Sequence, residues 1–256
     1  MAPITVGVSL KMYFGHRRGA EWCAAVADLA RTHPAVVAGA VELFVVPGYL
    51  QILPALEAFA GTTVRIGAQD VAAEDAGPFT GEVSPAELAE LGVLLAEIGH
   101  AERRRLFCET DAVVAAKTAA ALRNGLTPVL CVGEADQVPP TEAARATVTQ
   151  LQASLDGAPH GAVIVAYEPV WAIGAPEPAP DTHITTVTRA VRDAVRMLPG
   201  RAGSTVIYGG SAGPGLFDRI GEHIDGLFLG RFAHDPATLA AVLDEASRLA
   251  CCSGGP

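Results

Sequence analysis

Residues 161–174 read Gly-Ala-Val-Ile-Val-Ala-Tyr-Glu-Pro-Val-Trp-Ala-Ile-Gly. The apolar run that opens this stretch is typical of a buried strand, and Glu168 comes where that strand must stop, because Pro169 cannot continue it. A loop with a large aromatic residue, Trp171, and a glycine, Gly174, follows. A carboxylate at the carboxyl end of a buried strand, beneath a loop that could close over it, is well placed to be a general base.

The same alternation continues along the whole chain, where short apolar runs are followed by helical patterns. Runs this apolar are typical of parallel strands that are covered on both faces. Eight such pairs in 256 residues, with no linker between them, predict an α/β fold with a single domain. We expect a (β/α)8 barrel over residues 1–250 and a C-terminal tail at 251–256. A doubly wound open sheet is the alternative that the pattern allows.

The apolar runs also set the expected boundaries of the elements. The predicted strands are Ile4–Leu10, Val41–Val46, Val64–Ala68, Leu94–Ile98, Thr127–Val132, Ala162–Tyr167, Thr205–Tyr208 and Gly226–Leu229. The predicted helices lie near 18–31, 48–58, 84–91, 110–124, 141–155, 182–197, 213–219 and 236–250.

Composition excludes several classes of function. The formal net charge of −10 argues against a nucleic acid or an anionic membrane as partner, so an anionic substrate must be bound by a few local cations and backbone N–H groups. The five cysteines are widely spread without a Cys-x-x-Cys pair, and no signal peptide is visible, so we expect free thiols and a cytoplasmic protein. Neither zinc-ligand spacing nor a nucleotide-binding motif occurs, and we expect no cofactor and no metal.

Polar residues follow most of the predicted strands at their carboxyl ends. In a barrel these positions meet at one rim, where the loops build the site. The set is Lys11, Gln69-Asp70, His100, Glu134, Glu168, Gly209-Gly210-Ser211 and Gly230-Arg231.

Each of these groups also has an ordinary structural interpretation. His100 alone would more often be a hydrogen-bonded structural histidine, Lys11 a solvated lysine, and the glycines simple turns. Together, however, a carboxylate base, a neutral imidazole and a lysine are suited to proton abstraction next to a carbonyl, with stabilisation of the enediolate oxygen. The two glycine-containing loops, including Gly210, are typical of a phosphate site on the last two strands of such a barrel.

Seven sequence blocks, in order and over nearly the whole chain, resemble the triosephosphate isomerase family. They are Lys11-Met12, Gly67-Ala68-Gln69, Phe79-Thr80-Gly81-Glu82, Gly99-His100 with Glu102-Arg103-Arg104, Cys131-Val132-Gly133-Glu134, Ala166 to Gly174, and Tyr208-Gly209-Gly210-Ser211.

The resemblance implies a role for each matching residue. Glu168 would be the base, His100 the electrophile, Lys11 the electrostatic stabiliser and Glu102 a supporting carboxylate. Phosphate contacts are implied for Gly174, Ser211 and the region of Gly230. The loop at Phe79-Thr80-Gly81 resembles the one that reaches a neighbouring subunit, so a homodimer is expected.

The chain departs from the family pattern at four places. Ser9 stands where the family has an asparagine that contacts substrate, and its hydroxyl is shorter by about two heavy atoms. Ala101 replaces a serine that holds the base when the site is open. Pro176 replaces a loop glycine whose N–H closes onto the serine matched by Ser211, so that bond is lost. Arg231 replaces a glycine, where it could block a phosphate contact or supply a charged one.

These features predict a cofactor-free aldose–ketose isomerase. The main hypothesis is interconversion of glyceraldehyde 3-phosphate and dihydroxyacetone phosphate through an enediolate, as in glycolysis and gluconeogenesis. One alternative is an isomerase of a four-carbon ketose phosphate, because Ser9 makes room and Arg231 adds a donor. A second alternative is a non-catalytic relative that binds a phosphometabolite.

Overall fold

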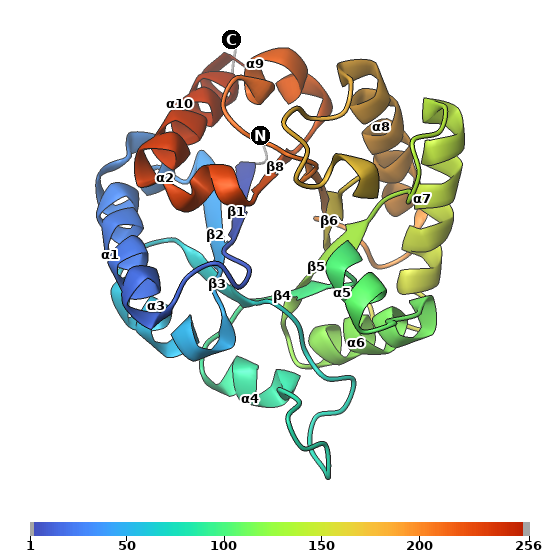
Figure 1. Ribbon diagram of the computed structural model, residues 1–256, viewed down its shortest axis with the longest axis horizontal. Coiled ribbons are helices and arrows are strands. Elements are labelled where there is room, and N and C mark those ends of the chain that lie inside the picture. The colour runs from blue at the N-terminus through green and yellow to red at the C-terminus, as the bar shows by residue number, and fades with distance from the viewer. Residues whose placement is uncertain (1–2, 253–256) are drawn as a thin grey trace.

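The computed structural model describes residues 3–252, and within that range eight parallel strands close into a barrel (Figure 1). Each strand pairs with the next along the chain, and the last pairs back with the first. The predicted (β/α)8 barrel is therefore confirmed, and the open sheet is excluded. The strands are β1 (Ile4–Ser9), β2 (Val41–Val46), β3 (Arg65–Ala68), β4 (Leu95–Ile98), β5 (Thr127–Val132), β6 (Ile164–Tyr167), β7 (Thr205–Tyr208) and β8 (Gly226–Leu229).

Helices surround the barrel and cover the outer faces of the strands (Figure 1). The α-helices are α1 (His16–Thr32), α2 (Pro34–Val37), α3 (Ile52–Ala58), α4 (Pro85–Glu90), α5 (Ala101–Leu106), α6 (Asp111–Arg123), α7 (Pro140–Ser154), α8 (Asp181–Met197), α9 (Leu216–Ile220) and α10 (Pro236–Cys252). The 3-10 turns are η1 (Tyr49–Gln51), η2 (Val170–Ala172), η3 (Gly221–His223) and η4 (Arg231–His234).

Most elements lie where the sequence predicted them, with ends that shift by a few residues. The short helices α2 and α5 were not predicted, because one or two turns carry too little apolar periodicity to be recognised. The last helix continues to Cys252, so the first two residues of the predicted tail are helical. The sequence has no glycine in this region before Gly254, which explains why the helix does not stop at 250. The remainder of the predicted tail lies outside the described residues.

Two layers of apolar side chains fill the molecule, one inside the barrel and one between strands and helices. The inner layer is made of alternate strand residues, such as Val129 and Cys131 on β5 and Ile164 and Ala166 on β6. Because strand side chains alternate between faces, Glu168 continues the inward series of β6. The packing inside the barrel therefore aims this carboxylate at the barrel axis.

The state of the cysteines and the character of the helices can be compared with the sequence predictions. Cys23, Cys108, Cys131 and Cys251 are free thiols. Among residues 3–252, no helix combines the length and the apolar character that crossing a bilayer requires.

Candidate active site

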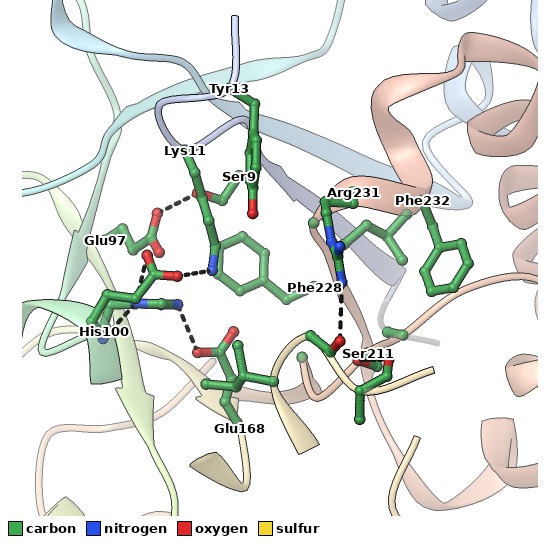
Figure 2. Close-up of a pocket in the computed structure, with 18 of the residues that line it drawn as sticks. Ser9, Lys11, Tyr13, Glu97, His100, Glu168, Ser211, Phe228, Arg231 and Phe232 are labelled. Carbon is green, nitrogen blue, oxygen red and sulfur yellow. Dashed lines mark hydrogen bonds and ion pairs between the residues drawn. The ribbon is translucent and has the colours of Figure 1, made fainter. Parts of the chain in front are cut away.

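A cavity of about 840 Å³ opens at the carboxyl ends of the strands (Figure 2). Nine of the residues predicted for the site line it, and they come from the end of β1 and from the segments that follow β1, β4, β6, β7 and β8. Gly210 does not line the cavity; its carbonyl oxygen accepts a hydrogen bond from Tyr208 Oη at 2.5 Å. The nine are Ser9, Lys11, His100, Glu102, Glu168, Gly174, Ser211, Gly230 and Arg231.

Glu168 is buried between two glycines, Gly133 and Gly209, whose backbone atoms pack closely against it. A Cβ atom at Gly133 would lie 2.0 Å from the carbonyl oxygen of Glu168, and one at Gly209 would lie 2.5 Å from its Oε1 atom. Both distances are far inside van der Waals contact, so only glycine fits at either position. The two glycines thus fix where the carboxylate can lie.

Burial also sets the proton affinity of this carboxyl group. Loss of solvation raises the pKa of Glu168 to about 8, and the neighbouring carboxylates Glu97 and Glu102 add to the rise, whereas the positive charge of Lys11 opposes it. The ordinary pKa of a glutamate side chain is 4.5. A base with this high proton affinity can remove a proton from a carbon next to a carbonyl.

His100 caps the first turn of α5 and is held as a neutral imidazole. Its Nδ1 atom accepts a hydrogen bond from the backbone N–H of Glu102 at 3.1 Å, so the ring hydrogen resides on Nε2. The Nε2 atom lies 3.3 Å from Glu168 Oε2 (Figure 2). Burial lowers the pKa of His100 to about 4, and the charge of Lys11 contributes. A neutral ring with its N–H facing the cavity can donate to a substrate oxygen.

Lys11 is held in a backbone conformation that non-glycine residues rarely adopt, with φ at 47°. Gln69 Nε2 donates to the Lys11 carbonyl oxygen at 3.0 Å and to that of Val46 at 3.2 Å, which fixes the turn. The Nζ atom lies 2.8 Å from Glu102 Oε1. Burial alone would lower the pKa of the ammonium, but the bond to Glu102 and the nearby carboxylates outweigh it and raise the pKa. Lys11 is therefore a fixed positive charge at the cavity wall.

The loop after β6 lies over the cavity and is held at its tip by two residues. Ser211 Oγ donates to the carbonyl oxygens of Ala172 at 2.8 Å and Ala175 at 2.9 Å, sharing its single hydrogen between them. Arg231 Nη2 donates to the Gly174 carbonyl oxygen at 3.1 Å. Pro176 cannot donate, as predicted, yet Ser211 is not left unpaired, because it serves as the donor and the loop carbonyls accept.

The start of the loop is fixed by Glu134, which lies behind the cavity and does not line it. Its carboxylate accepts from Tyr167 Oη at 3.1 Å and from Trp171 Nε1 at 2.9 Å, and it lies 2.9 Å from His183 Nε2. The Trp171 indole also packs edge-on against the His183 ring. Glu134 follows β5 as the sequence predicted, but its partners make it an anchor for the loop.

A family profile described as triosephosphate isomerase matches residues 4–246 of the chain. The chain belongs to the triosephosphate isomerase family. L-erythrulose-1-phosphate isomerase from Pectobacterium atrosepticum is 48% identical over 250 residues, which are 96% of this chain and 96% of that protein. Triosephosphate isomerase from Synechococcus sp. is 33% identical over 95% of this chain and 97% of its own length.

A solved structure supports the same relationship. Triosephosphate isomerase from Bartonella henselae matches with a TM-score of 0.80 at 27% identity, over 96% of this chain and 100% of that chain. The predicted enzyme class is thereby confirmed: the chain is an isomerase of the triosephosphate isomerase family, and its substrate is a phosphorylated sugar.

Several residues that line the cavity of this protein were not predicted from the sequence. Glu97 is the most important, because it is a buried carboxyl group on the cavity floor. Its signal was a charged residue inside the apolar run at Leu94–Ile98, which the search for strand ends passed over. Tyr13, Phe228 and Phe232 were also missed; they give the cavity an aromatic lining.

The raised pKa of Glu168 makes the stability of this family member depend on pH. In the unfolded chain the carboxyl group ionises near its ordinary pKa of 4.5, whereas in the fold it keeps its proton up to about pH 8. Stability is therefore lost as the pH rises through this window. Glu168→Gln stays neutral at every pH and does not lose this stability. We therefore expect the Tm of Glu168→Gln minus the Tm of wild type to increase by at least about 3 °C between about pH 5 and pH 8.5.

Thermal unfolding followed by circular dichroism across this pH range measures the difference. Glu42→Gln, at an exposed position of β2, is the matched control and should show no such growth. A constant Tm difference between Glu168→Gln and wild type across the range would contradict the raised pKa.

Proposed function

We propose that this enzyme isomerises L-erythrulose 1-phosphate. Proton-transfer chemistry is supported above all by one observation, the 3.3 Å approach of His100 Nε2 to the buried Glu168 carboxylate inside the cavity. The four-carbon substrate is supported by the relative from Pectobacterium atrosepticum, which is 48% identical and carries that substrate in its name. A protein from Rhizobium etli with the same name is 40% identical over 75% of this chain. The alternative from the sequence is thus better supported than the triose substrate.

The reaction follows from the chemistry of this substrate. Glu168 removes the proton from C3, next to the C2 carbonyl, and the electron pair forms an enediolate across C2 and C3. The Nε2–H of His100 and the ammonium of Lys11 stabilise the negative oxygen. A proton then moves from the C3 hydroxyl to the C2 oxygen, and return of the carbon-bound proton to C2 leaves a hydroxyl at C2 and the carbonyl at C3. Because C1 carries the phosphate ester, the product is again a ketose, erythrulose 4-phosphate, whereas a triose yields an aldose by the same step.

The phosphate group binds at the end of the cavity formed by Ser211, Gly230 and Arg231. Lys11 is neutralised by its ion pair with Glu102. Within the described part of the chain, Arg231 is the one cation lining the cavity without a carboxylate partner in an ion pair. In a protein with a net charge of −10, this guanidinium is the local attraction for a dianion.

Interconversion of triose phosphates is the second candidate function, and glycolysis and gluconeogenesis would be its setting. It requires the same base, imidazole and lysine, and the Synechococcus relative carries that activity in its name. A non-catalytic role has less support, because Glu168, His100 and Lys11 all face one cavity.

Direct kinetics separate these functions. We expect kcat/KM for L-erythrulose 1-phosphate to exceed that for dihydroxyacetone phosphate by at least about tenfold, because a site built for an extra hydroxyl discriminates against a substrate without it. Proton NMR in D₂O follows the reaction and detects deuterium entering the substrate carbons. Glu168→Gln should lower kcat by about 10²–10⁴-fold.

The opposite preference would favour the triose function. Absence of turnover on both substrates would favour the non-catalytic alternative. Equal turnover by wild type and Glu168→Gln would show that Glu168 is not the base.

The proposed phosphate site gives a separate prediction. Arg231→Met should raise KM for the phosphorylated substrate, and the inhibition constant of inorganic phosphate, by about 10- to 100-fold, because a charge-assisted hydrogen bond to the dianion is lost. Arg231→Lys keeps the charge and should recover part of the affinity. If phosphate inhibition is unchanged in Arg231→Met, Arg231 serves only to hold the Gly174 carbonyl.

We also propose a homodimer formed through the loop at Phe79-Thr80-Gly81. This loop lies between β3 and α4 and projects away from the barrel (Figure 1). Phe79, which follows β3, is 41% exposed. Met12 after β1 and Leu50 after β2 are exposed as well, so an apolar surface lies on this side of the barrel. Such a surface is typical of a subunit interface.

Sedimentation velocity tests this interface. We expect wild type to be a dimer and Phe79→Asp to dissociate into monomers, because a buried unpaired charge opposes association. Met197→Asp, at an exposed apolar position on α8, is the matched control and should remain dimeric. A monomeric wild type, or equal behaviour of the two variants, would contradict the proposal.

A further inference from the structure

Glu97 is a buried carboxyl group that has no role in the proton transfer proposed above. It lies on β4, lines the cavity, and is only 3% exposed. Its Oε2 atom accepts a hydrogen bond from Ser9 Oγ at 2.8 Å (Figure 2). Among the hydrogen bonds and ion pairs of residues 3–252, this is the one that its side chain makes.

The position is a poor one for a carboxylate on structural grounds. Leu95, two residues earlier on the same face, and Phe228 both belong to the apolar layer inside the barrel. Lys11 pairs with Glu102 and leaves Glu97 without a cation. Burial raises the pKa of Glu97 to about 7, although the Ser9 bond and the charge of Lys11 oppose the rise. Replacing buried charged groups with apolar residues of similar volume is often neutral or stabilising.

Proton transfer gives no clear reason for this carboxyl group either. Burial is the largest cause of the raised pKa of Glu168, and the charge of Glu97 only adds to that rise. A carboxyl group that serves neither the packing nor the proton transfer is explained if it binds part of the substrate.

The ligand group that fits is a hydroxyl. Ser9 uses its single hydrogen on Oε2, so the Ser9 oxygen and the second carboxyl oxygen of Glu97 are left for a ligand. An ionised carboxyl group accepts a hydrogen bond from a hydroxyl, and a protonated one can also donate to it. A methyl group or a hydrogen atom would leave these buried polar atoms unsatisfied.

The location of Glu97 indicates which hydroxyl this is. Figure 2 shows Glu97 across the cavity from Arg231 and Ser211, which hold the proposed phosphate end, with His100 on the same side as Glu97 and Glu168 below them. A substrate bound with its phosphate near Arg231 and its reacting carbons at Glu168 places its far end toward Glu97 and Ser9.

We propose that Glu97 and Ser9 form a specificity site that binds the C4 hydroxyl of the four-carbon substrate, the group that a triose phosphate lacks. This inference rests on the proposed function. Glu97 is a specificity-determining residue in this scheme, and it transfers no proton to or from carbon.

A substrate analogue isolates this hydroxyl. We would compare L-erythrulose 1-phosphate with its 4-deoxy analogue, which keeps all four carbons and the phosphate. For wild type we expect kcat/KM to favour the hydroxyl substrate by at least about 100-fold. Glu97→Met should reduce this ratio to within about threefold, chiefly by loss on the hydroxyl substrate.

Two further variants show whether hydrogen bonding is the cause. Glu97→Gln can accept and donate, so it should keep a ratio of at least about tenfold. Ser9→Ala should lower the ratio, because it removes the hydroxyl that orients Glu97. Glu42→Met, which replaces an exposed glutamate of β2 outside the cavity, should keep the wild-type ratio.

The outcomes separate this inference from the proposed function. Wild type that does not turn over L-erythrulose 1-phosphate overturns both. Wild type that does so, together with an unchanged ratio in Glu97→Met, overturns only the specificity site. Equal losses on both substrates would assign Glu97 to packing. If Glu97→Met does not fold, Ser9→Ala and Glu97→Gln decide by the same ratio.

Discussion

The chemistry of this barrel depends on keeping one carboxyl group away from water. Glu168 is enclosed by backbone at Gly133 and Gly209, and that enclosure raises its pKa to about 8. A strong base is obtained without a special partner, simply because its charged form is poorly solvated. Burial has the opposite effect on the pKa of the neighbouring imidazole: it lowers the pKa of His100 and so keeps the ring neutral. One physical cause, burial, therefore shifts the pKa values of both the proposed base and the proposed electrophile in the direction that their roles require.

The distribution of charge along the cavity follows from the acidic composition of the chain. A protein with a net charge of −10 must bind a sugar phosphate with few cations. Lys11 is balanced by Glu102 and in the proposed reaction acts on the reacting oxygen, whereas Arg231, which has no carboxylate partner among residues 3–252, lies at the proposed phosphate end. In the proposed reaction the two cations differ because one would stabilise a charge that develops during the reaction and the other a charge that is already present.

The sequence was sufficient for the barrel and for the residues at the strand ends. Apolar runs of strand length alternate so regularly that the eight strands could be placed, and Lys11, His100 and Glu168 were found because each follows such a run. Glu97 was missed because a charged residue within a strand can face either side, and only the register of the closed barrel places it inside. The roles of Gly210 and Ser211 depended on which backbone groups the folded loops bring together, and local pattern does not determine that.

The loop over the cavity contains three prolines, Pro176, Pro178 and Pro180, between an anchored start and the first turn of α8. Its start is fixed through Trp171 and Glu134, and near its end the Ala179 N–H donates to Tyr208 Oη at 3.0 Å. Each proline fixes one backbone torsion whether or not substrate is present, which removes conformations that a glycine-rich loop would lose only on closing. Covering the substrate therefore costs this loop little conformational entropy, and more of the binding energy of the phosphate remains to lower the barrier of the reaction.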